Sequence, residues 1–432
     1  MSMLTRRNFL RSLAAAGGLA ALQKVVAAEA GGADRTRSHT SRVNLMLGGQ
    51  KMSDFFRILD TPGTRISGLT IDGDARNQNE RQVGGILVRA DNCVIEDSEI
   101  FNCSGQGIYV QAVKNLKVRR CKIHDIWRQG IAFYGGTTEY GATVIEDCEI
   151  ARTQYEAIQI GGRGIVIRNN HLSNSPFGGL YALTRSKNFE ITRNLVEDGY
   201  GGFDLSWGGL NARAGTELSG RRVSDNVIQR CVNGIGTAAN GTLLYDNTIL
   251  DGGKGHQPTY TLLGVKLQVA SAGTGYAVGN VLSFVGGETI WNPAKVRVEV
   301  VDALGGIIRL SIWYLGCYTQ TPLNPIQLAG GTGSGASAQI SRWNRRLFVP
   351  NGIMVMDASY CAVTGNISGN TSPDNRTQKI GCLLVHTFDR PLKNTIVGNS
   401  FPMNLDYPLM GFRGGTYNSS LLTGNTIGMN AS

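Results

Sequence analysis

The sequence predicts an all-β repeat protein whose strands stack along one axis, and three observations support this. Apolar anchor residues recur every 22 to 29 residues, glycine makes up 58 of the 432 residues, and no helical stripe of apolar residues is sustained. Charged residues make up 17% and hydrophobic residues 41%, which is enough to bury a large core and excludes a disordered chain. The glycines follow no G-X-Y period, which excludes collagen.

The first thirty residues predict an export signal instead of a part of the fold. Thr5 to Arg11 resembles the twin-arginine export motif, an apolar stretch runs from Leu13 to Leu22, and Ala28 to Ala30 fits a small-x-small cleavage site. The apolar stretch is too short to stay as a membrane anchor. We therefore expect a signal peptide at residues 1–30, a linker or cap at 31–59, and a mature protein in the periplasm or outside the cell.

The rest of the chain repeats a short pattern in which a small polar residue stands two positions before an inward Ile or Leu. The first anchors are Ile71, Ile100, Ile123, Ile150, Leu172 and Leu195. One turn of a right-handed parallel β-helix needs three short strands and three bends, which fits this spacing. The polar positions predict a ladder of hydrogen-bonding side chains at one bend, formed by Ser98, Cys121, Cys148, Asn170, Asn226 and Asn247.

The repeat is interrupted once, between the anchors Ile249 and Ile367. Segment 258–346 has alternating strands and glycine turns in place of coils, as in Val296 to Val300, and predicts an inserted β-rich module. The β-helix is then expected over 60–257 and 347–432.

These repeats resemble the pectin-lyase-like β-helix superfamily over roughly residues 60–257 and 347–428. The resemblance implies an architecture that hosts lyases, hydrolases, epimerases and phage tailspikes, and so it names no reaction. The motifs of polygalacturonases, pectate lyases and alginate epimerases are absent. The insert resembles a small β module of phage tail proteins and of some secreted β-helix proteins, and the sequence leaves its role open.

Cysteine and histidine give little support to metal chemistry. The eight cysteines form no CxxC pair, and the five histidines lack metal-ligand spacing. The metal site is unknown, and Ca²⁺ held by carboxylates stays open because oxygen ligands need no fixed spacing. Cys121 and Cys148 occupy equivalent places in adjacent coils, where they could form a disulfide or remain free thiols.

The strand that begins near the glycine of each coil faces the expected ligand groove. Strand alternation places Tyr109, Ala132, Gln159, Tyr181, Asp204 and Gly236 in one outward column. Aromatic rings pack on sugar rings, while Gln and Arg bind hydroxyls and carboxylates. We expect the substrate-binding residues to be Tyr109, Gln129, Tyr134, Tyr155, Gln159, Arg185 and Trp207. A plain solvated sheet face is the competing interpretation.

Four residues are the catalytic candidates: Arg128, Glu156, Tyr181 and Asp204. Glu156 and Asp204 stand two coils apart, about 9–10 Å, near the separation of acid and base in an inverting glycosidase. In a lyase, Arg128 would neutralise a uronate carboxylate and Tyr181 would act as base, acid or both.

The charge balance favours an acidic partner. The formal net charge is +10, which suits an acidic polysaccharide, while scattered positive residues and export argue against nucleic acid. The sequence therefore predicts an exported carbohydrate-active enzyme, a lyase or a glycoside hydrolase. The alternative is a non-catalytic polysaccharide-binding or tailspike-like structural protein. A homo-oligomer stays open because the C-terminal coil end is short.

Overall fold

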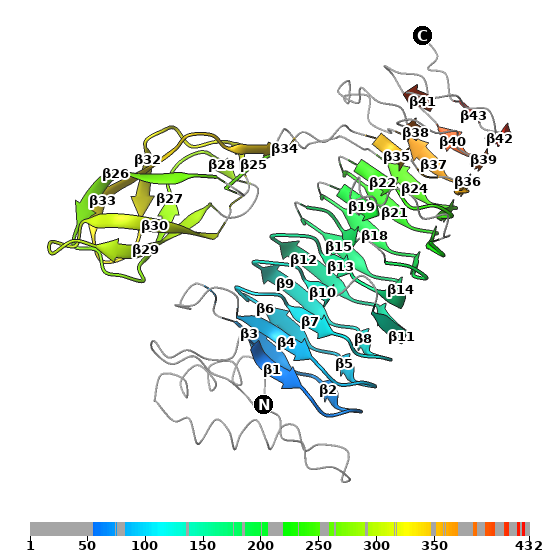
Figure 1. The fold of residues 1–432 in the computed structure, drawn as a ribbon, viewed down its shortest axis with the longest axis horizontal. Helices are drawn as coiled ribbons and strands as arrows, with labels where there is room; N and C mark the ends of the chain where they lie inside the picture. The colour runs from blue at the N-terminus through cyan, green and yellow to red at the C-terminus, as the bar shows by residue number, and fades with distance from the viewer. Residues whose placement is uncertain are drawn as a thin grey trace.

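The computed structural model shows a three-sided solenoid of parallel strands with a smaller antiparallel module beside it (Figure 1). All 43 elements are strands, and none of the described residues is helical. Within this part of the chain, no helix is long and apolar enough to cross a membrane. The structure describes residues 55–73, 75, 83–134, 138–175, 177–183, 186–199, 201–205, 219–231, 233–250, 259–262, 265–289, 293–314, 316, 318–346, 351–356, 358, 360–369, 383–386, 394–401, 410–413, 421–423 and 426–427.

Three parallel sheets of eleven strands each form the sides of the solenoid, which confirms the predicted β-helix. Sheet A consists of β1 (Phe55–Leu59), β4 (Gly84–Val88), β7 (Ile108–Gln111), β10 (Ile131–Tyr134), β13 (Ile158–Ile160), β16 (Leu180–Ala182), β19 (Gly201–Leu205), β22 (Asn233–Thr237), β35 (Asn351–Met356), β38 (Leu383–His386) and β41 (Met410–Arg413). Sheet B consists of β2 (Arg65–Ser67), β5 (Val94–Glu96), β8 (Lys117–Arg119), β11 (Glu139–Glu146), β14 (Arg163–Arg168), β17 (Glu190–Thr192), β20 (Arg222–Ser224), β23 (Leu243–Tyr245), β36 (Ala362–Thr364), β39 (Thr395–Val397) and β42 (Leu421–Thr423). Sheet C consists of β3 (Thr70–Asp72), β6 (Glu99–Phe101), β9 (Lys122–Ile126), β12 (Glu149–Thr153), β15 (His171–Ser173), β18 (Leu195–Glu197), β21 (Val227–Gln229), β24 (Thr248–Leu250), β37 (Ile367–Gly369), β40 (Ser400–Phe401) and β43 (Thr426–Ile427).

The first coil begins earlier than the sequence predicts. Residues Phe55–Leu59, expected in a linker or cap that ends at residue 59, form β1 and pair in parallel with β4. Their alternating burial is that of a strand with one face on the core. The cap expectation is therefore wrong for these five residues.

The chain turns from sheet B to sheet C at a corner where one residue has left-handed backbone. The corner residues have φ between 51° and 68° and are Gly68, Asp97, Arg120, Asp147, Asn169, Arg193, Asp225, Asp246, Gly365 and Gly398. Gly, Asn and Asp adopt this conformation at the lowest steric cost. These three residue types occupy eight of the ten corners, three positions before the inward residue of sheet C, and Arg120 and Arg193 occupy the other two.

From Asn170 onward, the next residue in each described coil belongs to an internal ladder of asparagines, whereas Ser98, Cys121 and Cys148 occupy this position in earlier coils. Each Asn Nδ2 donates to the Oδ1 of the next coil over 2.9–3.0 Å, in the order Asn170, Asn194, Asn226, Asn247, Asn366 and Asn399. All six are at most 2% exposed. The Oδ1 atoms also accept from backbone N–H groups, for example from Asn194 N to Asn226 Oδ1 over 2.9 Å. The ladder satisfies polar groups that the corner would otherwise bury unpaired.

This ladder corrects two predicted anchors. In sheet C, Leu172 pairs with Val196 and not with Leu195, so Val196 is the inward residue and Asn194 joins the ladder. Ile249 pairs with Ser368, and Ile367 is 40% exposed. The physical reason is the same in both coils, because the ladder asparagine sets which of two following residues points inward.

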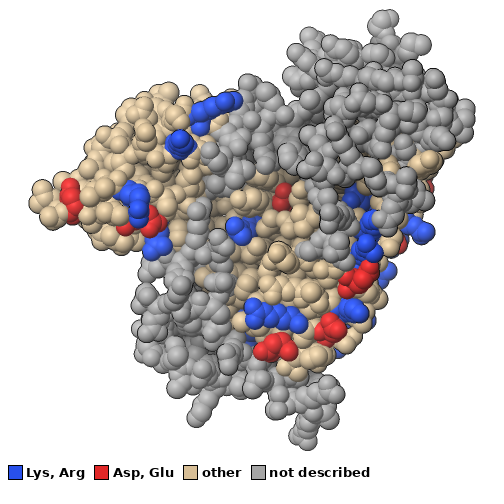
Figure 2. Space-filling view, in the orientation of Figure 1, with Lys and Arg blue, Asp and Glu red and all other residues tan. Residues whose placement is uncertain are grey.

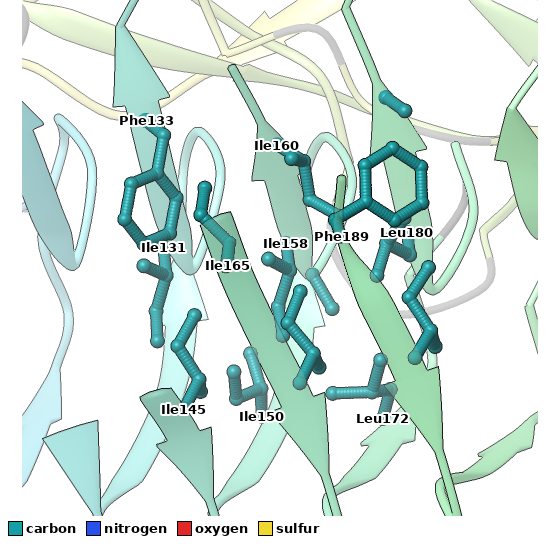
Figure 3. Close-up of a cluster of buried hydrophobic side chains, with 14 of the residues drawn as sticks. Ile131, Phe133, Ile145, Ile150, Ile158, Ile160, Ile165, Leu172, Leu180 and Phe189 are labelled. Carbon is teal, nitrogen blue, oxygen red and sulfur yellow. The ribbon is translucent and has the colours of Figure 1, made fainter. Parts of the chain in front are cut away.

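The interior of the solenoid is a continuous apolar core. Stacked residues of the three sheets contact one another across the narrow interior, and Figure 3 shows one stretch of this packing. Among the labelled residues, Ile131, Ile158 and Leu180 come from sheet A, while Ile150 and Leu172 come from sheet C. These five side chains have no exposed surface, so the core leaves ligands to bind on the outside.

A network of charges covers part of sheet B. Glu96 has no exposed surface and forms ion pairs with Arg65, Arg119 and Arg120 on neighbouring coils. Burial raises the pKa of Glu96, but hydrogen bonds from Arg119 and Arg65 outweigh this and leave the pKa below its ordinary value. Figure 2 shows basic and acidic side chains next to each other along the solenoid.

The antiparallel module occupies the interruption of the repeat. A four-stranded sheet has the order β28 (Glu288–Thr289), β31 (Tyr318–Gln320), β25 (Thr259–Thr261) and β34 (Asn344–Arg346). A six-stranded sheet has the order β26 (Leu267–Thr274), β33 (Ser334–Ile340), β32 (Ile326–Ala329), β27 (Val281–Phe284), β29 (Lys295–Val301) and β30 (Ile307–Tyr314). Both sheets surround a separate apolar core, which confirms an inserted small β domain.

The solenoid continues across this insert without a gap. Strand β22 pairs directly with β35, as do β23 with β36 and β24 with β37. The first and last strands of the module, β25 and β34, also pair with each other. The insert therefore leaves and rejoins the solenoid between two adjacent coils.

Candidate functional site

The outward column of sheet A has the predicted register. Tyr109, Ala132, Gln159, Tyr181, Asp204 and Gly236 are consecutive partners on adjacent strands. Their inward neighbours, from Ile108 to Ile235, are at most 2% exposed. Tyr109, Gln159 and Tyr181 are half-buried, whereas Ala132 is buried. The column thus presents polar and aromatic groups on a rigid backbone.

Three aromatic rings form a platform at the N-terminal part of this sheet. The rings of Phe55 and Tyr109 stack with centroids 5.9 Å apart and planes 2° apart. Gly84 permits this contact, because a Cβ there would lie 2.3 Å from Phe55 Cε1. Tyr134 meets Tyr109 edge-on at 6.3 Å and is 64% exposed. Phe55 is buried beneath this surface, whereas Tyr134 and the half-buried Tyr109 offer aromatic surface that packs against the faces of sugars.

Polar groups border the aromatic platform. Gln129 Nε2 donates to Gln159 Oε1 over 2.9 Å, which joins two predicted binding residues. Arg128 is half-buried and forms no ion pair with a described carboxylate. Burial raises the pKa of Tyr109, while the neighbouring Gln111 and Arg128 oppose this rise. Arg128 is therefore a cation available to an anionic group beside Tyr109.

Three members of this surface were not predicted from the sequence. Phe55 was expected in the cap, Gln111 lies two positions after Tyr109 on β7, and Arg89 directly follows β4. Arg89 Nε donates to Gln111 Oε1 over 3.3 Å. Gln111 pairs with Tyr134 in the sheet, so a second outward row runs beside the first. The alternation of β7 and β10 could have revealed this row.

For three predicted site residues, the side chain lies outside the part of the chain that the structure describes. The backbone of Asp204 lies on β19 between Tyr181 and Gly236, but its side chain lies outside the described residues. Arg185 and Trp207 also lie outside them. Glu156 stands directly before β13 and is only 9% exposed, so its carboxyl has limited access from the sheet face. The catalytic roles stay predictions.

Tyr155 lies at the edge where the insert docks. Its ring stacks on Phe177 of the next coil, with centroids 5.0 Å apart, and it packs against the apolar core of the insert. Trp127, one coil earlier, contacts Trp313 and Tyr314 of β30 at centroid distances of 5.9 and 5.1 Å. The insert therefore borders the turn that carries Arg128 and Gln129.

The described residues favour no metal centre and no disulfide. No group of three or more His, Cys, Asp or Glu side chains among them could hold a metal ion. The described cysteines, Cys93, Cys103, Cys121, Cys148, Cys231 and Cys361, are buried free thiols. Of the two alternatives for Cys121 and Cys148, this structure has the free thiols. The described residues supply no set of ligands for the Ca²⁺ ion that the sequence left open.

Comparison with solved structures finds similar chains of low sequence identity. The A-module of mannuronan C-5 epimerase AlgE6 from Azotobacter vinelandii has 13% identity over 86% of this chain and 76% of that chain, with a TM-score of 0.46. The DFA-IIIase of Arthrobacter chlorophenolicus A6 has 12% identity over 84% and 65%, with a TM-score of 0.41. The tailspike protein of E. coli bacteriophage HK620 has 10% identity over 86% and 55%, with a TM-score of 0.46.

These likenesses concern the fold alone, and the chain spans less than two thirds of the length of the last two proteins. A search of curated proteins found no match. The model of the right handed beta helix region matches residues 54–142 and 107–280, which together exceed half of the 432 residues. With its three parallel sheets, the chain therefore belongs to the right-handed β-helix family.

Proposed function

We propose that this protein is an exported carbohydrate-active enzyme that binds an acidic polysaccharide along sheet A and cleaves it. The observation that carries the proposal is the surface around Tyr109. It combines a stacked aromatic pair, the exposed Tyr134 and the Gln129–Gln159 amide pair with Arg128, which has no described carboxylate partner. Aromatic faces with amides and a cation suit the apolar face, hydroxyls and carboxylate of a uronate sugar.

Among cleavage reactions, β-elimination fits the described side chains best. Arg128 neutralises the uronate carboxylate, which makes the C5 proton more acidic. Tyr181, half-buried on the outward column, takes that proton. The electron pair forms the C4–C5 double bond and the C4–O bond breaks. Tyr181, which took the C5 proton as a phenolate, then gives that proton to the departing oxygen. The reaction consumes no water and leaves an unsaturated sugar.

Hydrolysis is the second candidate because Asp204 neighbours Tyr181 in the sheet register. It requires two carboxyl groups, Asp204 and Glu156, as acid and base on either side of the sugar. Glu156 is only 9% exposed, which limits its reach to a polymer and ranks hydrolysis second. A binding protein without turnover would use the same aromatic platform.

A product assay distinguishes these functions. The mature protein is incubated with acidic and neutral polysaccharides, and each reaction is read for unsaturated-sugar absorbance and for new reducing ends. The variants are Tyr181→Phe, Arg128→Gln and Asp204→Asn, with Tyr360→Phe, an exposed tyrosine on a distant coil, as the matched control. Tyr181→Phe is expected to lower turnover at least about 100-fold.

Absorbance that rises with reducing ends supports the lyase. Reducing ends alone, lost in Asp204→Asn, would replace the lyase by the hydrolase. Binding without any product would contradict both reactions and leave a polysaccharide-binding protein.

A further inference from the structure

The contact between the insert and the solenoid is built around one tryptophan. Trp127, in the turn after β9, meets the rings of Trp313 and Tyr314 edge-on, at interplanar angles of 89° and 65°. Lys295 Nζ of β29 lies 5.7 Å from the centroid of the Trp127 ring. Three residues of the insert therefore hold the side chain that directly precedes Arg128.

Arg297 adds a cation that no described carboxylate neutralises. Its Cζ lies 5.4 Å above the ring centroid of Trp313. Glu299, two residues further along β29, accepts a hydrogen bond from Ser311 Oγ over 2.5 Å. Among the described ion pairs, none includes Arg297. Arg297 is half-buried, so the positive charge is partly desolvated at the junction.

Two buried N–H donors lack an acceptor here, one on the ring beneath this cation and one on the cation itself. Trp313 is 3% exposed, and its Nε1 has no hydrogen-bond partner. Arg297 Nε is also buried and unpaired. Native proteins satisfy nearly all buried donors, so an unpaired indole N–H under a guanidinium that also has an unpaired N–H indicates a site that oxygen atoms of an anion complete.

We propose that Arg297 and Trp313 of the insert, with Arg128 and Trp127 of the solenoid, form a subsite that binds the carboxylate of a uronate unit at the junction. The guanidinium presents planar N–H groups that match two carboxylate oxygens, the buried Trp313 contributes its Nε1 donor, and the half-buried Trp127 offers aromatic surface to the sugar. This subsite rests on the function proposed above and deepens it, because it makes the insert part of the substrate site. A chain of uronates would then contact both parts of the protein at once.

The test measures binding by the full mature protein to polygalacturonate and to alginate, each beside its esterified form, by isothermal titration calorimetry. Arg297→Gln is compared with Arg309→Gln, which removes an exposed arginine from the neighbouring strand β30 of the same module. Arg297→Gln is expected to weaken binding of the acidic polymer about tenfold, the loss of one charge-assisted contact. Arg309→Gln should stay within about twofold of the wild type.

Two further variants guard against a folding artefact. Arg297→Lys keeps the charge but loses the planar fork, and it should fall between wild type and Arg297→Gln. Trp313→Phe keeps an aromatic ring and removes the Nε1 donor, and it should weaken binding of the acidic form more than of the ester. Thermal unfolding of each variant confirms that the module is folded.

The outcomes separate the two proposals. If Arg128→Gln weakens binding while Arg297→Gln binds like the wild type, the proposed function stands and the junction subsite is wrong. If Arg297→Gln weakens the acidic and esterified forms equally, carboxylate recognition is wrong. A wild-type protein that binds neither acidic polymer overturns the proposed function and the subsite with it.

Discussion

The side chain of Asn247 donates a hydrogen bond from Nδ2 to Oδ1 of Asn366 over 2.9 Å, although 119 residues separate the two in sequence. The whole insert lies between them. The backbone N–H of Asn247 donates to the same Oδ1 over 3.0 Å. The ladder is therefore as regular across the insertion as within the uninterrupted coils.

The ladder predicts a large loss of stability from a small substitution. Asn247→Ala takes the shared acceptor from the buried backbone N–H and Nδ2 of Asn226, and it takes a donor from Asn366 Oδ1 and from the carbonyl of Val223. We expect the free energy of unfolding to fall by about 3 kcal/mol, measured by urea titration. Thr248→Ala, one residue later and half-buried, should cost less than about 1 kcal/mol. Equal losses in the two variants would contradict the ladder's role.

The charge network of sheet B predicts weaker stability in acid. The folded pKa of Glu96 lies below the ordinary value of 4.5, so the unfolded chain takes up the proton first. The contribution of Glu96 is complete above about pH 4.5 and is lost as the pH falls through the folded pKa. Unfolding midpoints between pH 7 and pH 3 should fall less steeply in Glu96→Gln than in the wild type.

The matched control for that experiment is Glu139→Gln, because Glu139 pairs with Arg163 but its side chain is 58% exposed. Its profile should follow the wild type. A Glu96→Gln profile as steep as the wild type would show that other carboxyls cause the acid sensitivity.

The burial of the cysteine side chains predicts that their thiols react slowly with reagents in solution. Burial raises the pKa of Cys231 to about 12 and that of Cys361 to about 11, which suppresses the reactive thiolate. Six of the eight cysteines are buried free thiols, and Cys317 and Cys382 lie outside the described residues. In the native protein we expect at most two thiols to react rapidly with an aromatic disulfide reagent. Rapid labelling of three or more would contradict the burial.

The Trp127 contacts predict that one substitution loosens the insert. Trp127→Ala removes two aromatic contacts, worth together about 1–3 kcal/mol of docking free energy. Hydrogen exchange in Ile307–Tyr314 should accelerate, while the core strands of the solenoid keep their protection. Leu304→Ala, which truncates a side chain that is 78% exposed on the same module, should leave exchange unchanged. If hydrogen exchange in Trp127→Ala is unchanged, contacts other than those of Trp127 hold the insert against the solenoid.

The export signal predicts a specific dependence on arginine. Replacing Arg6 and Arg7 together by lysine should retain the unprocessed protein in the cytoplasm, as seen by cell fractionation and immunoblotting. Arg11→Lys should still permit export, because lysine is the usual residue at that position of the resembled motif. Processing of the double variant at the wild-type rate would contradict the twin-arginine assignment.

The sequence predicts the coils well because each one repeats the same physical constraints. Left-handed corners select Asp, Asn and Gly, and strand alternation then assigns the outward column from Tyr109 to Gly236. One error arose at Ile367–Ser368, where the apolar residue is the outward one, and the other arose at Leu195–Val196, where two apolar residues follow the ladder position. There the hydrophobic pattern alone allows either residue inside, and only the stacked asparagines decide between them.

The candidate site was harder to predict because parts of it come from contacts between distant segments. The stacking of Phe55 on Tyr109 depends on Gly84 in the strand between them. The position of Tyr155 depends on an insert more than 100 residues away in the sequence. A periodic pattern carries information about neighbouring coils, but it contains none about where a separately folded module docks.

The pairing of β25 with β34 bears on how such a chain arises in evolution. Because the first and last strands of the module hydrogen-bond each other, its two ends lie side by side, as the ends of two adjacent coils do. A gene segment that encodes such a unit can enter a solenoid gene by one recombination event without shifting the coils on either side. Related solenoids that lack the module, or carry a different one at the same coil, are the expected record of that exchange.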